Sequence, residues 1–259
     1  MTDSRILVER LGNVARLRFN DPSTRNALSM DMAIELRDRL REVEQSARVI
    51  VLAGSEKAFC SGANLGDGAD GARPGEIDAG LGLEDYVNPV MMTLRESRVP
   101  LVTAVRGAAA GVGASFALMG DIIVAGQSAY FLQAFSRIGL VPDGGSPWLL
   151  MRTVGRVRAM ELMMLGEKLG AQQAHDWGMV TRVVPDSEVD DVALSFAQRL
   201  ADGPTRALAL TRKAAWAAAE STFEAELRLE RWLQQEAGFH ADFKEGVAAF
   251  LEKRPARFV

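Results

Sequence analysis

Three short apolar runs constrain the fold of this chain more than any other feature. They cover residues 48–54 (RVIVLAG), 100–107 (PLVTAVRG) and 121–126 (DIIVAG), and the first has no polar residue between Val49 and Ala53. Runs of this length and composition predict strands that are buried on both faces, as in parallel sheets. Parallel strands need crossover connections, which are usually helical. The sequence therefore predicts an α/β fold.

The segments around these runs predict the other elements of such a core. Residues 5–9 and 14–19 alternate between apolar and polar side chains on either side of Leu11-Gly12-Asn13, which predicts a hairpin. Between Ser29 and Ala47 apolar residues recur at helical spacing, at Met32, Leu36, Leu40 and Val43. Further helices are expected over 83–97 and within 108–120. The glycine-rich residues 61–82 predict a long loop, and such loops are often functional.

The pattern changes near residue 200. Residues 203–220, 221–238 and 241–254 are helical in pattern and have little strand character. Pro204 suits a first helical position, and Ser221 with Glu224 fits a capping box. We therefore expect an α/β core over 1–200 and a C-terminal helical region over 201–259.

Composition excludes several classes of function. The 259 residues carry a net charge of −4, which offers no basic face for nucleic acid. The single cysteine, Cys60, excludes an internal disulfide framework and suits a reducing compartment. The first residues, MTDSRILVERLGN, lack the pattern of a signal peptide, and no apolar run is long enough for a membrane span. We expect a cytoplasmic protein.

Two glycine-containing turns follow predicted strands, in AFCSGANL (58–65) and in RGAAAGVGASF (106–116). Free N–H groups at the start of a helix bind oxyanions, and two such amides directed at one carbonyl oxygen would form an oxyanion hole. Glycines in such turns also serve close packing alone. The turns therefore leave a catalytic and a structural interpretation open.

One carboxylate interrupts the apolar segment SRIGLVPDGGSPWLL (136–150). Asp143 follows Pro142 and precedes Gly144 and Gly145. An Asp-Gly turn whose carboxylate caps a nearby N–H is one interpretation. The other interpretation is a carboxylate in an apolar pocket, where burial raises its pKa and lets it act as a proton shuttle near neutral pH.

The whole chain resembles the enoyl-CoA hydratase/isomerase (crotonase) superfamily. The resemblance is carried, in the expected order, by STRNALS, KAFCSGANL, VPLVTAVRGAAAGVGASFALMGDIIVA, RIGLVPDGGSPWLL, GRVRAMELMMLGEKLGAQQAHDWGMVTRVV and EGVAAFLEKR. Within the superfamily, FLQAFSRIGLVPDGG, GPTRALALTRKA and LERWLQQEAGFHADFKEGVAAFLEKRP resemble the ring-epoxide isomerases that act on epoxidised phenylacetyl-CoA.

The resemblance implies a ββα superhelix whose two roughly perpendicular sheets are wrapped by helices. C-terminal helices would join three chains into a homotrimer, commonly paired into a hexamer. The substrate would be an acyl-CoA thioester whose carbonyl is held by the N–H groups of Ala63 and Val112, with Asp143 as the catalytic group. Coenzyme A would be part of the substrate, and no resident cofactor or metal is expected. The further positions implied to bind the acyl-CoA are Arg25, Ala27, Ser61, Asn64, Leu65, Gly111, Ser115 and Phe135.

The sequence departs from the hydratase pattern at both acids. Where hydratases have two glutamates, this chain has Ser115 and Phe135. Adding water across a double bond needs a general base and a general acid. A 1,3-proton shift needs only one group that removes and returns the proton, and Asp143 suits that role. Asn64 stands where the family usually has aspartate.

Four functions compete on these residues. The first is an isomerase that shifts a double bond or opens a ring epoxide. The second is a hydratase-type lyase with atypical acids. An aroyl-CoA dehalogenase-like hydrolase, with Asp143 as nucleophile, would need a histidine base that neither His175 nor His240 is well placed to supply. A non-catalytic relative that binds CoA or RNA is the fourth, and the acidic net charge opposes RNA.

The remaining candidates have ordinary interpretations beside the functional ones. Cys60 has no histidine near it in sequence and suits a small buried filler. Two histidines and one cysteine show no metal-ligand spacing. Arg25 and Lys57 are either solvated or near CoA phosphates, and Phe135 and Trp148 line an aromatic acyl pocket or belong to the core. The acids of the long loop, most of which should be solvated, are Asp67, Asp70, Glu76, Asp78, Glu84 and Asp85.

Overall fold

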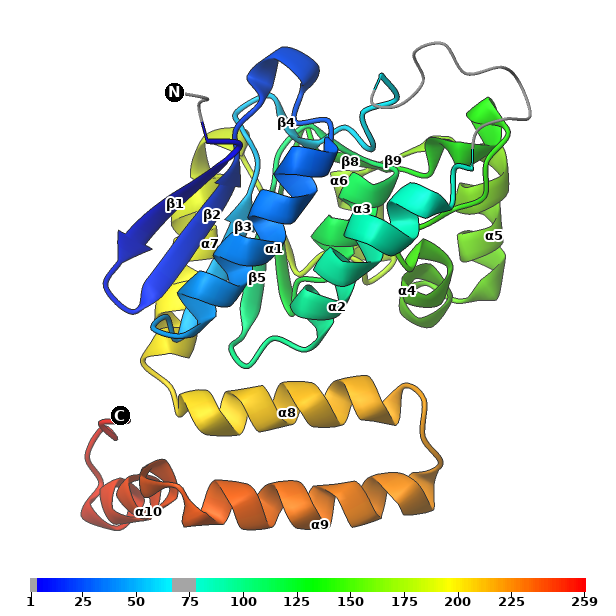
Figure 1. The fold of residues 1–259 in the computed structure, drawn as a ribbon. Helices are drawn as coiled ribbons and strands as arrows, with labels where there is room; N and C mark the ends of the chain where they lie inside the picture. Colours follow the sequence, from blue (N-terminus) through cyan, green and yellow to red (C-terminus); the bar gives the residue numbers. More distant parts are fainter. Residues whose placement is uncertain (1–3, 67–77) are drawn as a thin grey trace.

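The computed structural model describes residues 4–66 and 78–259 and contains two β-sheets surrounded by helices (Figure 1). The larger sheet has the strand order β1-β2-β3-β5-β7-β10. Its strands are β1 (Ile6–Leu11), β2 (Val14–Phe19), β3 (Val49–Ala53), β5 (Leu101–Val105), β7 (Ile122–Gly126) and β10 (Arg182–Val184). The smaller sheet, β4-β6-β8-β9, consists of β4 (Ala58–Cys60), β6 (Ala108–Ala110), β8 (Tyr130–Leu132) and β9 (Lys168–Gly170).

The predicted strands are confirmed in the larger sheet. β1 and β2 form the antiparallel hairpin, closed at Gly12, and β2, β3, β5, β7 and β10 are parallel. All residues of β3 and β5 are buried, because helices cover both faces of this sheet. That burial is why their sequences are continuous apolar runs.

The chain passes from one sheet to the other three times by the same route. β3 leads to β4, β5 to β6, and β7 to β8, and each pair is followed by helix. β4, β6 and β8 are parallel neighbours, so their carboxyl ends lie along one edge of the smaller sheet. This repeated strand–strand–helix unit confirms the ββα superhelix that the resemblance to the crotonase superfamily implies.

Helix α1 (Met30–Glu44) illustrates how the sequence sets an element. Ser29 caps it by accepting a hydrogen bond from the Met32 N–H, 3.2 Å. The predicted apolar stripe is buried, including Leu36, Leu40 and Val43. The predicted helix over 83–97 is a π-helical turn, Leu83–Val87, followed by α2 (Asn88–Arg95).

Other helices cover the sheets and lead to the C-terminus. They are α3 (Val112–Leu118), η3 (Ala134–Ile138, a 3-10 helix), α4 (Ser146–Thr153), α5 (Arg156–Leu165), α6 (Ala171–Asp176) and α7 (Val189–Ala201). α7 packs on β3, β5 and β7, opposite the face that α1 and α2 cover. None of the helices in the described part of the chain has the length and apolar character needed to cross a bilayer.

Three helices follow α7, as the pattern after residue 200 predicts. They are α8 (Thr205–Ala218), α9 (Phe223–Phe239) and α10 (Ala241–Glu252). In Figure 1, α8 runs below the sheets and α9 runs back beside it. The predicted cap of α9 was wrong by one residue, because Thr222 rather than Ser221 accepts the Ala225 N–H; the Ser221 hydroxyl instead donates to Glu226.

Candidate active site

The two glycine turns lie against each other at the carboxyl ends of β4 and β6. Gly62 has φ +107° and Gly111 has φ +52°, backbone conformations that favour glycine. A Cβ atom placed on Gly111 would lie 3.6 Å from the Gly62 Cα. The neighbouring Gly113 allows an even closer approach, because a Cβ there would lie 2.3 Å from the Cys60 carbonyl oxygen. These glycines therefore allow α3 to pack directly onto β4.

Each turn presents one free main-chain amide. The Leu28 N–H donates to the Gly62 carbonyl, 2.7 Å, and the Leu28 carbonyl accepts the Asn64 N–H, 2.9 Å. In this parallel bridge the N–H of the intervening residue, Ala63, is directed away from Leu28. Val112 is the first residue of α3, so its N–H has no acceptor within the helix. Across residues 4–66 and 78–259, neither amide has a hydrogen-bond acceptor.

Asp143 lies between η3 and α4, on a turn that packs against α3. A Cβ on Gly144 would lie 3.0 Å from the Ser115 Oγ and 3.2 Å from a methyl carbon of Val112. The main-chain carbonyl of Asp143 accepts hydrogen bonds from the Ser115 hydroxyl, 3.2 Å, and from the Ser146 N–H, 3.0 Å. The turn that carries Asp143 is therefore fixed beside the residue that supplies the Val112 amide.

The Asp143 carboxyl group is half-buried, and its Oδ1 has no hydrogen-bond partner in the part of the chain that the structure describes. Burial alone raises the pKa of Asp143 to about 6. The capping interpretation of Asp143 is not what the structure shows, since the N-cap of α4 is Gly145 and the Ser146 N–H binds a main-chain oxygen. An unpaired carboxyl with this pKa can both accept and return a proton near neutral pH.

Ser115 and Phe135 complete the wall around the glycine turns. The buried Ser115 hydroxyl lies 2.6 Å from the Ser146 hydroxyl. The buried Phe135 ring lies over Gly111, 3.6 Å from a Cβ placed there. Neither position carries an acid, and within residues 4–66 and 78–259 Asp143 is the carboxylate that lies beside these turns.

The remaining predicted binding residues lie along a segment beside the first turn. The Ser61 N–H donates to the Arg25 carbonyl, 3.2 Å, and the Ser61 hydroxyl donates to the Thr24 carbonyl, 3.0 Å. The Ala27 N–H donates to the Thr24 hydroxyl, 3.2 Å. The side chains of Arg25 and Leu65 are exposed, and Asn64 accepts the Gly66 N–H. Lys57, just before β4, is also exposed.

Sequence reasoning missed Asn26, which holds this segment in place. Its side chain is fully buried and donates to the carbonyls of Ala58, 2.9 Å, and Phe59, 3.1 Å, while its Oδ1 accepts the Asp21 N–H. Its φ of +59° is a conformation that asparagine tolerates better than most residues. The sequence shows only an asparagine inside STRNALS. Its role could not be predicted from this, because its partners Ala58 and Phe59 are more distant in the chain.

The other single residues have structural surroundings. Cys60 is fully buried, as predicted, and desolvation raises the pKa of its thiol to about 12, which disfavours a nucleophilic thiolate. His175 Nδ1 lies 2.8 Å from the Val180 carbonyl oxygen, and His240 caps α10. Within the described ranges there is no cluster of three or more histidine, cysteine or acidic side chains that could hold a metal ion.

The loop acids divide between described and undescribed residues. Asp78, Glu84 and Asp85 are exposed, and Asp78 accepts the Gly80 N–H. Asp67, Asp70 and Glu76 lie outside the described residues.

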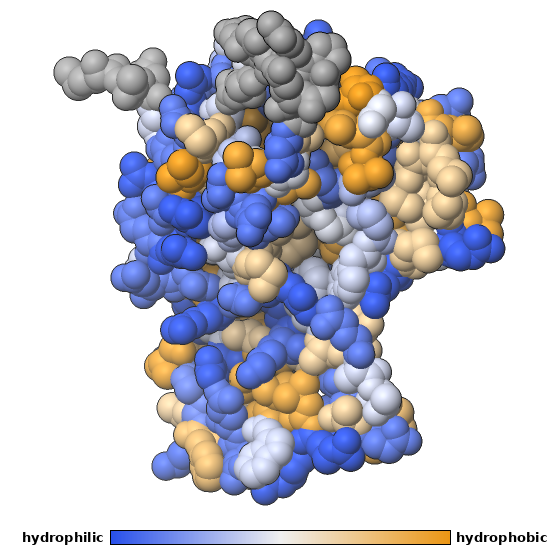
Figure 2. Space-filling view, turned by 45° about the vertical axis from the view of Figure 1, so that its right-hand side comes forward, coloured by the Kyte–Doolittle hydropathy of each residue, from blue (hydrophilic) through white to orange (hydrophobic). Residues whose placement is uncertain are grey.

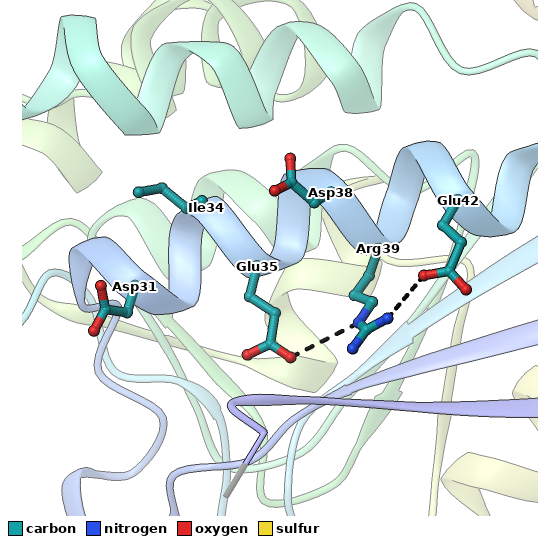
Figure 3. Close-up of a pocket in the computed structure, with 6 residues that line it drawn as sticks. All are labelled: Asp31, Ile34, Glu35, Asp38, Arg39 and Glu42. Carbon is teal, nitrogen blue, oxygen red and sulfur yellow. Dashed lines mark hydrogen bonds and ion pairs between the residues drawn. The ribbon is translucent and has the colours of Figure 1, made fainter. Parts of the chain in front are cut away.

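A hollow on the outer face of α1 is lined by Arg39 and by four acidic side chains, two of which, Glu35 and Glu42, contact Arg39 (Figure 3). Arg39 pairs with Glu42 at 2.8 Å and with Glu35 at 3.8 Å, at helical spacings of three and four residues. These are the contacts of a solvated helix face.

The fold belongs to the crotonase class. A solved enoyl-CoA hydratase from Polaromonas sp. JS666 superimposes with a TM-score of 0.90 at 32% identity, covering 98% of this chain and 99% of that one. Another from Mycobacterium smegmatis gives a TM-score of 0.90 at 28% identity, covering 99% of each chain.

The chain belongs to the enoyl-CoA hydratase/isomerase family, whose model matches residues 9–259. It is 42% identical to the 1,2-epoxyphenylacetyl-CoA isomerase of Escherichia coli K12, over 95% of this chain and 94% of the relative. It is 43% identical to a "Probable enoyl-CoA hydratase" of Rhodobacter capsulatus, over the same shares. The names of the relatives similar to this chain include both isomerases and hydratases.

Proposed function

We propose that this protein is an acyl-CoA isomerase that moves a proton along the acyl group of a CoA thioester, either shifting a double bond or opening a ring epoxide. The observation that carries the proposal is the half-buried, unpaired Asp143 carboxyl, fixed beside two turns that each present a free amide.

In this mechanism the Ala63 and Val112 N–H groups donate to the thioester carbonyl oxygen. Asp143 in its ionised form removes a proton from the α-carbon, and the electron pair moves onto the carbonyl oxygen. The two amides stabilise the resulting enolate, because they are already oriented toward the developing negative charge. Asp143 then returns the same proton to the γ-carbon, which completes a 1,3 shift without any co-reactant. Opening an arene epoxide to an oxepin is likewise an isomerisation that needs no water.

The residues at the two hydratase positions favour isomerisation over hydration. Hydration needs a second acid–base group to activate water. Ser115 is engaged with Ser146 and with the Asp143 carbonyl, and Phe135 is a hydrocarbon ring. The relative named as a 1,2-epoxyphenylacetyl-CoA isomerase is consistent with this choice.

The competing functions lack groups that they need. A dehalogenase-like hydrolase requires a base for its aryl ester, while His175 contacts Val180 and His240 caps α10. A binding-only relative has no use for an unpaired, half-buried carboxylate, whose desolvation costs free energy. RNA binding is opposed by the net charge of −4.

The proposal includes the way in which the rest of the substrate binds. Arg25 and Lys57 are exposed cations beside the first turn and would approach the CoA phosphates, and Ala27, Ser61, Asn64 and Leu65 would contact the CoA arm. Gly111, Ser115 and Phe135 would surround the acyl group near the reacting carbons. No resident cofactor is part of the mechanism, and the single cysteine supports a cytoplasmic location.

We further propose that the C-terminal helices assemble the protein into a homotrimer or a hexamer. Apolar side chains are exposed on α9 and α10, with 84% of Phe239, 82% of Phe250 and 73% of Leu251 accessible. Figure 2 shows apolar surface over these helices, at the bottom of the view. Exposed apolar groups of this size are typical of protein–protein contacts.

The test is turnover of three thioesters by the purified protein: a 3-enoyl-CoA, a 2-enoyl-CoA in water, and an epoxyphenylacetyl-CoA. We expect isomerisation of the first or the third and no 3-hydroxyacyl-CoA from the second. We expect Asp143→Asn to lower the isomerisation rate by about 10²–10⁴-fold. Unchanged turnover in that variant would remove the proposed role of Asp143, and hydration of the 2-enoyl-CoA would favour the hydratase.

A further inference from the structure

An apolar pocket of about 330 Å³ lies between α2, α4 and α8, next to the Asp143 turn. Its apolar wall contains the following residues: Met91, Met92, Met119, Trp148, Leu149 and Trp216. Gly145, two residues after Asp143, also lines it. The volume lies within the range of small-molecule sites.

Helix α3 connects this pocket to the candidate active site. Val112, Ser115 and Met119 are three and four residues apart, so they share one face of the α3 segment. Gly144 packs on Val112 and Ser115, and Met119 lies one turn further along, a rise of about 6 Å. The pocket therefore lies about one helical turn from the contact between Gly144 and α3, on the same face of this helix.

Two indoles form a fixed wall of the pocket. Trp148 on α4 and Trp216 on α8 stack with ring centroids 5.2 Å apart and planes at 16°. The Arg152 guanidinium covers Trp148 at 4.1 Å and donates to the carbonyl of Ala219, the C-cap residue of α8. Trp216 and Arg152 occupy the two faces of the Trp148 ring. A ligand in the pocket can therefore contact only the edge of this ring.

The charges at the pocket are paired. Arg95 and Glu220, which both line it, form an ion pair of 2.9 Å. A charged distal group on the substrate would have to displace one of these partners, whereas an apolar group would not.

We propose that this pocket receives the distal part of the acyl group, that it selects an apolar ring, and that Trp216 determines this specificity; the inference rests on the proposed acyl-CoA function. Indole edges and methionine thioethers both pair favourably with the face of an aromatic ring. The pocket supplies two indoles and three methionines for such contacts. Trp216 comes from the C-terminal helical region, so this region contributes to substrate choice.

The test is binding rather than turnover, with two thioesters that have no double bond to shift. The dissociation constants of phenylacetyl-CoA and acetyl-CoA are measured by titration calorimetry on the full-length protein. We expect the wild type to prefer phenylacetyl-CoA by at least about tenfold, the scale of burying a phenyl ring. Trp216→Ala should reduce this preference severalfold or more, and Trp216→Phe should retain most of it.

Two further variants keep the test decisive. Trp232→Ala removes an exposed tryptophan from α9, outside the pocket, and should leave the preference unchanged. Met92→Ala, at a half-exposed pocket position, should lower the preference for phenylacetyl-CoA. Because Met92 lies at the surface, this variant should fold, and it tests the pocket if Trp216→Ala does not fold. Equal binding of both thioesters by the wild type, or an undiminished preference in folded Trp216→Ala and Met92→Ala, would overturn the pocket assignment.

Turnover of a 3-enoyl-CoA, measured in parallel, separates the two proposals. A protein that prefers phenylacetyl-CoA through Trp216 but isomerises no thioester would refute the proposed function and support the pocket. A protein that isomerises the 3-enoyl-CoA but does not prefer phenylacetyl-CoA to acetyl-CoA would support the proposed function and refute the pocket assignment.

Discussion

Asp143 is held half-buried with Oδ1 unpartnered, and its environment favours the neutral acid over the carboxylate. The main chain around it is well bonded, through the Ser115 hydroxyl and the Ser146 N–H. The polypeptide thus fixes the turn without using the side chain, which leaves the carboxyl group available for chemistry. Because this carboxyl group titrates near neutral pH, both the free energy of unfolding and the isomerisation rate should depend on pH.

Asp143→Asn should stabilise the protein at pH 7.5 and have little effect at pH 4. The folded pKa of about 6 lies above the unfolded value of 3.8, so the folded state binds more protons between these values. The stability of the wild type therefore falls as pH rises through this window and stays lower above it. The gain is on the order of 1 kcal/mol, because the carboxyl is partly exposed to solvent. Thermal melts at several pH values measure it, and equal melting temperatures at pH 7.5 would contradict it.

The pH profile of isomerisation should rise and then level off near the pKa of Asp143. Since the ionised form removes the proton, kcat/KM should fall about tenfold per pH unit below about 6 and be constant above it. Replacing the exposed Asp38 by Asn serves as the control and should leave the profile unchanged. A plateau that extends down to pH 4.5 would show that another group carries the proton.

At the scale of elements, Arg212 joins α8 to the sheets and to α2. Its buried guanidinium donates to the Asp121 carboxylate at 2.9 Å and to the carbonyls of Leu94, Arg95 and Ser97 at the end of α2. One side chain thus satisfies acceptors from two segments, including carbonyls that a helix end leaves free.

Arg212→Leu should destabilise the protein by about 2–4 kcal/mol, because it removes the cation that pairs with Asp121 and the donor to three carbonyls. Urea unfolding measures the loss. Adding Asp121→Asn should recover part of it, since the second change removes the unpaired charge. An unchanged unfolding midpoint in Arg212→Leu would show that α8 is held by other contacts.

The longer elements could be predicted from the sequence, while the short strands of the second sheet could not. α1 and the strands β3, β5 and β7 have clear periodicity or continuous apolar runs. β4, β6, β8 and β9 have three residues each, too few for any period to be visible. Their existence depends on pairing between segments that are distant in the chain.

The candidate site shows the same division. Glycines and an isolated acid mark the two turns and Asp143 in the sequence, because positive φ and burial restrict the residue type. No comparable feature of the sequence indicates the roles of Asn26 and Trp216. Their parts depend on the carbonyls of Ala58 and Phe59 and on the ring of Trp148, which only the folded chain brings to them.

At the scale of the whole molecule, the C-terminal helices carry both the proposed assembly surface and part of the proposed acyl pocket. α8 contributes Trp216 to the pocket and Arg212 to the contact with α2, and α9 and α10 expose aromatic side chains away from the core. The division into a core over 1–200 and a helical region over 201–259 remains a prediction, as does the oligomeric state.

Phe239→Ser combined with Phe250→Ser should convert the assembled protein to monomers. Both side chains are more than four-fifths exposed in the single chain, so their loss removes contacts between subunits rather than core packing. Light scattering after gel filtration measures the mass. Met164→Ser, an exposed apolar residue on α5, is the matched control and should keep the wild-type mass. A double variant of unchanged mass would place the subunit contact elsewhere.

The direct packing of Gly113 on Cys60 and of Gly111 beside Gly62 means that the spacing between the Ala63 and Val112 amides is a property of the backbone. Any descendant of this chain that keeps these glycines keeps the same spacing of the two amides, whichever residues stand at 115, 135 and 143. If these amides bind the thioester carbonyl as proposed, substitutions at the three positions can change the acid–base group, and with it the reaction, while the fold stays the same.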